Sequence, residues 1–185
     1  MHSGSNSPVY YLGALYDSRI DAIWAAFFDN LSWSYEYKPS GPRGWAPTFA
    51  LRGAGTVLVG VEQELQPTPK ARLLASRSVR DAGGRSDILL LGIGLVHSEY
   101  WGLALGALGE CSGDYYCWGD ALPHSGGGIG FCHSLGSFRN RITGYHDGDR
   151  GAGDGEDLFA GAWRSAQRAP LLDCQAVAAA PIWGR

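Results

Sequence analysis

The sequence contains few cysteines and no long apolar run. Four cysteines in 185 residues are too few for a disulfide framework. No run of about 18 apolar residues occurs, so we expect no transmembrane helix. The first residues, MHSGSNSPVYYLG, lack the basic segment and apolar core of a secretory signal. Together these absences predict a cytoplasmic protein with no membrane partner.

Positive charge is also scarce. The chain has 15 Lys and Arg against 18 Asp and Glu, and a net charge of −3. Proteins that grip the nucleic-acid backbone usually carry a basic balance, because phosphate contacts supply most of their affinity. The overall charge therefore argues against tight nonspecific binding to nucleic acid, although it leaves a local basic patch open.

Apolar residues and glycine are plentiful. Hydrophobic residues make up 45% of the chain, which is ample for a buried core, and the length suits one domain with an appended subdomain. Most of the 28 glycines lie beyond residue 80. They predict many turns and irregular connections in the second half.

The first clear periodicity predicts an amphipathic helix over residues 18–31. Its apolar positions recur at steps of three and four residues. They are Ile20, Ile23, Trp24, Phe27, Phe28 and Leu31. Ser18 or Asp17 suits the N-cap, and Asp21 falls near the edge of the apolar face.

Strand patterns follow this helix. Residues 33–37 alternate as a half-buried strand does, residues 45–51 suggest a short strand, and residues 56–61 are β-branched and apolar. A helix is expected over 69–80, then a strand over 87–92 that is buried on both faces. The order αβββαβ predicts an α/β (α+β) fold with a mixed central sheet flanked by helices.

The second half is less regular. A short helix is expected within residues 100–110, then a Gly-rich irregular stretch over 111–155 and a closing helix over 156–168. The predicted organisation is a disordered N-terminus (1–9), a core (10–100), a Cys/His module with the closing helix (101–170) and a C-terminal tail (171–185).

Several segments resemble one family. They are YDSRIDAIWAAFFDNLSWSYEYKP, WAPTFAL, TVLVGVEQ, DILLLGIG, FCHSLGSFRNRITGYHDGD and LFAGAWRSAQRA. They are similar to small phage and actinobacterial proteins that join a PD-(D/E)XK nuclease-like core to a Cys-bearing, zinc-ribbon-like module. The resemblance covers about residues 9–168 and implies a PD-(D/E)XK-like core with an irregular C-terminal subdomain.

The resemblance also implies a metal site that this chain lacks in part. Phosphodiester hydrolysis of this type uses carboxylates around a hard divalent metal, usually Mg²⁺. The family's helix carboxylate corresponds to Asp21, but its other two carboxylates correspond to Thr48 and Gly60, and its lysine to Glu62. The resemblance therefore predicts a catalytically degenerate core with no metal cofactor.

Relocated ligands are the alternative. Glu62 and Glu64 lie on the same alternating face as Gly60, and with Asp21 they are candidate catalytic residues for Mg²⁺ or Mn²⁺. The favoured interpretation is that both glutamates are ordinary solvent-exposed charges at the end of a strand.

The Cys/His module at 101–170 also lacks some of the expected metal ligands. The resemblance places the module's second cysteine pair at Asn140 and Thr143, so the usual zinc site is degenerate. A rebuilt zinc site is the alternative to free thiols. Its candidate ligands are Cys111, Cys117, Cys132 and His133.

A cluster of Arg139, Arg141 and Arg150, interleaved with Phe138 and Tyr145, is a candidate nucleic-acid contact. The alternative is a solvated surface of ion pairs. We therefore expect a degenerate nuclease-like protein of phage or mobile-element origin that binds DNA or a protein partner. An active metal-dependent endonuclease and an interaction module that targets a host protein are the alternatives.

Overall fold

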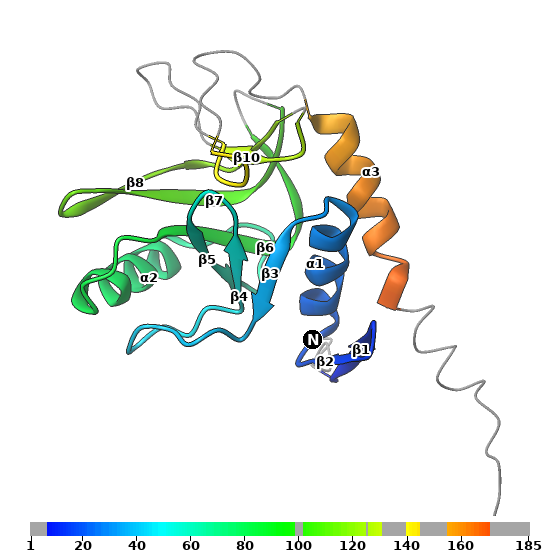
Figure 1. Ribbon diagram of the computed structural model, residues 1–185, viewed down its shortest axis with the longest axis horizontal. Coiled ribbons are helices and arrows are strands. Elements are labelled where there is room, and N and C mark those ends of the chain that lie inside the picture. The colour runs from blue at the N-terminus through cyan, green and yellow to red at the C-terminus, as the bar shows by residue number, and fades with distance from the viewer. Residues whose placement is uncertain (1–6, 99–101, 125, 131–139, 145–154, 171–185) are drawn as a thin grey trace, which may run out of the picture. The chain divides into compact units, whose positions relative to one another are not determined.

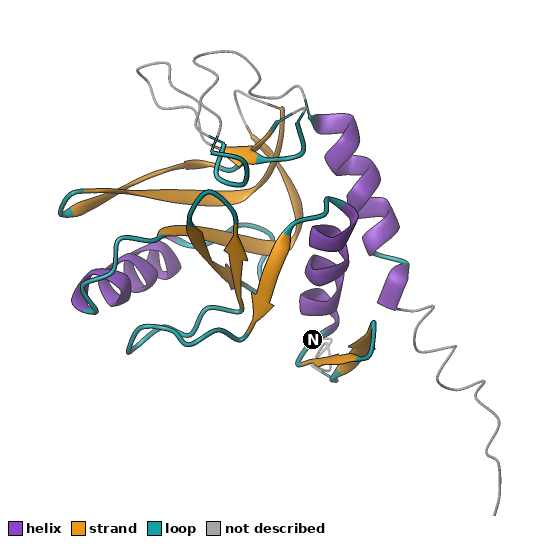
Figure 2. Ribbon diagram, in the orientation of Figure 1, coloured by secondary structure: helices purple, strands orange, loops and turns teal. Residues whose placement is uncertain are grey.

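The computed structural model describes residues 7–98, 102–124, 126–130, 140–144 and 155–170. These residues form three helices and ten strands (Figures 1 and 2). They fall into two compact units, one from Met1–Ser32 with Gly161–Arg185 and one from Trp33–Ala160. The mixed sheet with helices confirms the predicted α/β (α+β) class.

The first unit joins the two ends of the chain. Strands β1 (Val9–Tyr11) and β2 (Ala14–Tyr16) form an antiparallel hairpin, which the sequence pattern did not predict. Helix α1 (Arg19–Asn30) confirms the helix expected over 18–31, and the Ser18 hydroxyl caps it by accepting from the backbone N–H of Asp21 at 3.2 Å. Its aromatic face is fully buried.

Helix α3 (Glu156–Ala166) confirms the predicted closing helix, and its second half belongs to the first unit. The ring of Trp163 lies 4.5 Å from that of Trp24, centroid to centroid. The side chain of Asn30 donates to the carbonyl of Ala162 at 3.0 Å. Residues more than 130 positions apart therefore make one small aromatic core.

The second unit is built on a six-stranded mixed sheet in the order β3-β4-β5-β6-β7-β8. These strands are β3 (Ser34–Tyr37), β4 (Phe49–Arg52), β5 (Thr56–Val61), β6 (Asp87–Ser98), β7 (Gly102–Ser112) and β8 (Tyr115–Asp120). β5 and β6 pair in parallel, and the other neighbours are antiparallel. The strands expected over 33–37, 56–61 and 87–92 are confirmed, although β6 runs longer.

Helix α2 (Pro69–Asp81) connects the parallel strands and lies along one face of the sheet (Figure 1). Thr68 caps it by accepting from the N–H of Ala71, and Pro69 supplies a preset first residue. The buried side of α2 packs Ala75 and Val79 against Ile88 and Leu90. The helix expected over 69–80 is thus confirmed, with its core-facing side fixed.

The helix expected within residues 100–110 is wrong, because this segment is strand β7. β7 lies between β6 and β8 and is largely buried, so it shows no alternation of apolar and polar residues. The predicted boundary near residue 100 also falls inside this sheet, since β6 pairs with β7. Beyond β8, β9 (Leu122–Pro123) and β10 (Ile129–Gly130) form a further antiparallel pair.

Within the described part of the chain, none of the helices has the length and apolar character needed to cross a membrane.

Candidate functional site

Thr48 stands where the resemblance expects a carboxylate, just before β4. Its backbone N–H donates to the carbonyl of Val59 at 2.7 Å. Its hydroxyl oxygen accepts from the N–H of Val61 at 3.2 Å. The side chain of Thr48 is therefore part of the hydrogen bonding that joins β4 to β5.

Gly60, the second substituted position, lies against a tryptophan. A Cβ atom added at Gly60 would stand 3.0 Å from Cδ2 of Leu90 and 3.0 Å from the indole of Trp45. Trp45 itself packs against the core cluster beneath α2. The first carbon of any side chain at this position would therefore already be in tight contact with packed neighbours.

Glu62 and Glu64 follow β5. The parallel pairing with β6 ends at Val61, but two backbone hydrogen bonds still join the next residues to β6: the N–H of Glu62 donates to the carbonyl of Leu91, and the carbonyl of Glu64 accepts from the N–H of Ile93. Glu62 is half-buried and Glu64 is exposed. Burial raises the pKa of the Glu62 carboxyl, and the neighbouring Glu64 carboxylate raises it further. β5 ends at Val61, so both glutamates lie just beyond the strand, and their placement on one alternating face stays a prediction.

Asp21 lies in the first turn of α1 and is buried, with 8% of its surface exposed. Its backbone N–H is held by the Ser18 cap. Asp21 belongs to the first unit, whereas Thr48, Gly60, Glu62 and Glu64 belong to the second.

The residues at the implied metal positions do not fit a divalent ion. Thr48 uses its hydroxyl to accept a backbone hydrogen bond, and Gly60 has no side-chain ligand atom, while a Cβ there would already meet Leu90 and Trp45 at 3.0 Å. A hard cation takes oxygen ligands, most often carboxylates. Among the residues that the structure describes, no three His, Cys, Asp or Glu side chains group as metal ligands do.

Cys111 and Cys117 lie on the β7–β8 hairpin as free thiols. Cys117 pairs with Glu110, while Cys111 pairs with Tyr116. Directly paired residues share a face of a sheet and adjacent residues alternate, so the two cysteines point to opposite faces. They do not converge on one ion. Cys132 and His133, the other two candidate ligands, lie outside the described residues.

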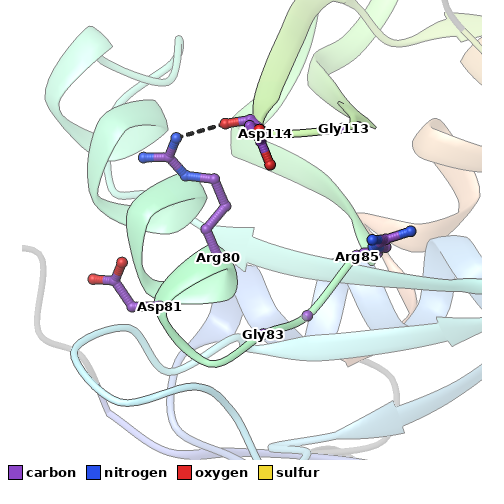
Figure 3. A pocket seen from close by; sticks show the side chains of 7 residues that line it. Arg80, Asp81, Gly83, Arg85, Gly113 and Asp114 are labelled. Atoms are coloured by element: carbon purple, nitrogen blue, oxygen red, sulfur yellow. Dashed lines mark hydrogen bonds between the residues drawn. The ribbon is translucent and has the colours of Figure 1, made fainter.

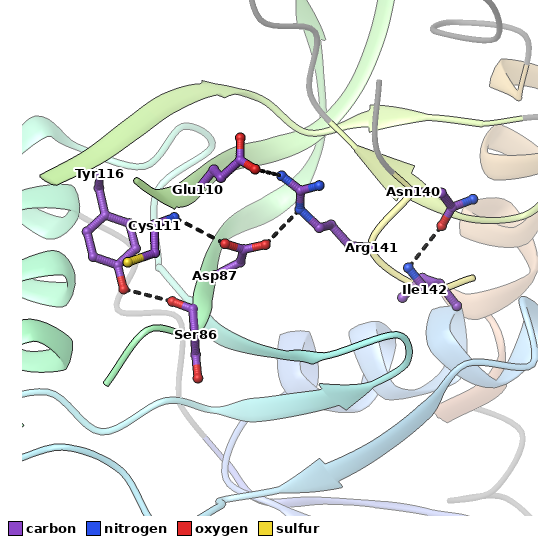
Figure 4. A network of polar contacts seen from close by, with 8 residues as sticks. All are labelled: Ser86, Asp87, Glu110, Cys111, Tyr116, Asn140, Arg141 and Ile142. Atoms are coloured by element: carbon purple, nitrogen blue, oxygen red, sulfur yellow. Dashed lines mark hydrogen bonds and ion pairs between the residues drawn. The ribbon is translucent and has the colours of Figure 1, made fainter. Parts of the chain in front are cut away.

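Arg141 is buried rather than solvent-facing. Only 4% of its side chain is exposed, and its guanidinium pairs with two carboxylates from the sheet (Figure 4). Nε lies 2.7 Å from Asp87, at the start of β6, and Nη2 lies 3.1 Å from Glu110 in β7. This placement differs from the expected nucleic-acid contact, because a buried and doubly paired guanidinium has no surface to offer a phosphate. Arg139 and Arg150 lie outside the described residues.

The turn at 140–144 is fixed by its own side chains. The Asn140 side-chain oxygen accepts from the N–H groups of Ile142 and Thr143, at 2.9 and 3.1 Å. The Ile142 carbonyl accepts from Ala54 at 2.9 Å, at the β4–β5 connection. At the positions where the resemblance implies a cysteine pair, this chain therefore has an asparagine-capped turn docked on the sheet.

The same network includes a tyrosine. The Tyr116 hydroxyl donates to the carbonyl of Ser86 at 2.7 Å, and the N–H of Cys111 donates to Asp87 at 3.1 Å (Figure 4). Burial raises the pKa of the Tyr116 phenol, and its contact with Cys111 raises it further. The phenol is therefore a structural donor at neutral pH.

A basic surface on α2 was missed by the sequence analysis. Residues 38–86 hold eight of the fifteen Lys and Arg but three of the eighteen Asp and Glu, so the overall acidity conceals a cationic segment. The exposed cations on and beside α2 are Arg43, Lys70, Arg77, Arg80 and Arg85, named here the α2 basic surface. Among the described residues, none of them has a carboxylate within 4.0 Å. Charge counted by segment would have found it.

A hollow of about 360 Å³ lies at the carboxyl end of α2, lined by Arg80, Arg85 and Asp114 among others (Figure 3). Arg80 donates through Nη1 to the carbonyl of Asp114 at 2.8 Å. Gly83 (φ +71°) and Gly113 (φ +63°) border the hollow, and a Cβ on either would meet no atom within 4 Å. No side chain in the described part of the chain therefore shields the backbone at Gly83 and Gly113 from solvent.

A second hollow, of about 570 Å³, lies beside the same helix end and is lined by Arg43, Ser78 and Asp81 among others. Asp81 lines both hollows. The α2 basic surface therefore continues into two concave places, each holding at least one arginine.

Comparison of the chain with protein-family models, curated proteins and solved structures gives no match. The resemblance to the PD-(D/E)XK nuclease-like family stays a prediction from the sequence.

Proposed function

We propose that this protein is a catalytically degenerate, nuclease-like protein of phage or mobile-element origin that acts by binding. Its partner is DNA or a protein. The observation that carries this proposal is the packing at Gly60, where the Trp45 indole and Leu90 lie 3.0 Å from the place of a Cβ atom and so take up the space in which the family's glutamate would begin. The Thr48 hydroxyl, already accepting from Val61, adds to it.

The residues around Thr48 and Gly60 favour binding over metal-dependent hydrolysis. A metal-dependent hydrolase needs carboxylates that hold the ion and position the attacking water. Gly60 supplies none, and ionising Glu62 is disfavoured by burial and by Glu64. Rebuilding the site would require the movement of a packed tryptophan, which costs core packing energy.

The test is a cleavage assay. Supercoiled plasmid and a short duplex are incubated with the purified protein and Mg²⁺ or Mn²⁺. We expect no nicking above a metal-free control. Metal-dependent nicking that disappears in Glu62→Gln, and persists in the exposed-site control Glu36→Gln, would contradict the proposal.

A second candidate is an active endonuclease with relocated ligands, and one observation favours it. The Glu64 carboxylate helps to raise the pKa of the Glu62 carboxyl, and a bound cation would offset that repulsion. Calorimetric titration with Mn²⁺ tests this: binding lost in both Glu62→Gln and Glu64→Gln supports it, and the absence of heat removes it.

A further inference from the structure

The exposed side of α2 carries cations at regular places. Lys70, Arg77 and Arg80 are exposed at steps of seven and three residues, which is the spacing of one helix face. Leu73 and Leu74 lie between them on the same side, 50% and 47% exposed. The opposite side of the helix packs on the sheet. The surface is therefore a stripe of separated positive charges with an apolar middle.

These cations are available to a ligand. Lys70, Arg77 and Arg85 make no side-chain hydrogen bond or ion pair with any described residue, and Arg80 spends one of its five donors on a backbone carbonyl. Asp81 is the only acidic residue within α2 itself.

From these observations we infer that the α2 basic surface is the contact for the phosphate backbone of nucleic acid, with duplex DNA as the ligand. The inference rests on the proposed binding function, and it selects DNA from the two partner classes. The ten helical steps from Lys70 to Arg80 span about 15 Å. Duplex DNA carries one charge per roughly 1.7 Å of axis, so this length faces more phosphates than it has cations.

The shape of the surface supports a backbone contact. The hollow of about 360 Å³ at the end of α2 exposes glycine backbone at Gly83 and Gly113, where no side chain keeps a ligand away. Arg85 lies at this hollow beyond Arg80 (Figure 3). Arginine at the hollow and cations along the helix together offer phosphate contacts in a row, which is how backbone-positioning residues act.

A charge-neutralisation experiment tests the inference. Binding of a labelled short duplex is followed by fluorescence anisotropy over a series of salt concentrations. The triple variant Lys70→Gln/Arg77→Gln/Arg85→Gln replaces side chains that have no partner among the described residues, and we expect its affinity to fall at least tenfold. The slope of log K against log salt should shrink by about 3, because each lost phosphate contact removes roughly 0.9.

Two matched variants accompany it. Arg52→Gln removes an equally exposed arginine that already pairs with Glu36, and it should leave binding unchanged. Asp81→Asn removes the acidic residue shared by both hollows, and it should tighten binding. Thermal melting of each variant verifies that the fold is retained.

The outcomes separate the two proposals. Duplex binding by the parent protein that is equal in the triple variant would overturn the surface assignment and leave the binding function standing. No salt-dependent binding by the parent protein, or binding of poly-L-glutamate as tight as that of the duplex, would overturn the choice of DNA. Metal-dependent nicking would instead defeat the proposed loss of catalysis.

Discussion

The two ends of the parallel β5–β6 pair treat carboxylates in opposite ways. At the amino end, Asp87 and Glu110 are held by the buried guanidinium of Arg141. At the carboxyl end, Glu62 and Glu64 repel each other, and the Glu62 pKa is raised. At the amino end, the buried Arg141 neutralises the two carboxylates, so they serve to stabilise the fold. At the carboxyl end, Glu62 and Glu64 have no such cation among the described residues and lie close in sequence to Gly60, which packs against Trp45. A cluster of acidic residues therefore does not by itself indicate a functional site, because the groups paired with the carboxylates determine what they do.

The largest expected effect comes from removing Arg141, the cation that pairs with Asp87 and Glu110. Arg141→Met leaves two partly buried carboxylates without their cation, and should lower the free energy of unfolding by about 3 kcal/mol. Urea unfolding followed by tryptophan fluorescence measures it. The control Arg52→Met breaks an exposed pair with Glu36 and should cost about 0–1 kcal/mol. Equal losses in both variants would show that burial of the pair contributes nothing.

The next largest effect is expected at Gly60, which packs against Trp45 and Leu90. Gly60→Ala places a Cβ 3.0 Å from Leu90 and Trp45, and should cost about 1–3 kcal/mol through overpacking. The control Gly55→Ala meets no atom within 4 Å, so it should be neutral or slightly stabilising. In a Trp45→Phe background the penalty of Gly60→Ala should shrink, which a double-mutant cycle detects. An undiminished penalty would assign the clash to Leu90 instead.

A smaller effect tests the turn that holds Arg141 in place. Asn140→Ala removes the acceptor for the N–H groups of Ile142 and Thr143, and should cost about 1–2 kcal/mol. Asn140→Asp keeps an acceptor oxygen and should lose less. If the aspartate variant is as unstable as the alanine variant, the turn is not held by this oxygen.

The smallest effect concerns pH at the carboxyl end of the β5–β6 pair. Because the folded-state pKa of Glu62 is raised above the ordinary value of 4.5, the folded protein binds more protons than the unfolded chain just above that pH. The contribution of Glu62 to stability is therefore present at low pH and lost as pH rises through the folded pKa. Glu62→Gln should remove this fall and make the protein slightly more stable than the parent at neutral pH. Parallel stability–pH profiles for the two proteins would contradict the raised pKa.

The elements with clear periodicity were predictable. The helix at α1 follows from apolar spacing and the Ser18 cap, and α2 follows from its proline-bounded start. Strand β7 was not predictable in this way, because GLALGALGE is buried on both faces and rich in helix-favouring Leu and Ala. Pairing with β6 and β8 outweighed that local preference.

The sites were predictable only in part. Alternation predicted that Glu62 and Glu64 share one face, but β5 ends at Val61, before either residue. The burial of Arg141 was not visible, since its partners Asp87 and Glu110 lie 54 and 31 positions away in the sequence. The packing of Trp45 over Gly60 likewise depends on tertiary structure, because fifteen residues separate them and no local pattern links them.

The first unit has a consequence for synthesis on the ribosome. Helix α1 is made before α3, so Trp24 and Asn30 meet their partners Trp163 and Ala162 only after more than 130 further residues have been added. Until then the aromatic face of α1 lacks that cover, a condition that favours chaperone binding or aggregation in nascent chains. The six-stranded sheet, by contrast, is complete by Asp120 and depends mostly on neighbours close in sequence. The aromatic core around α1 can therefore form only after α3 has been made.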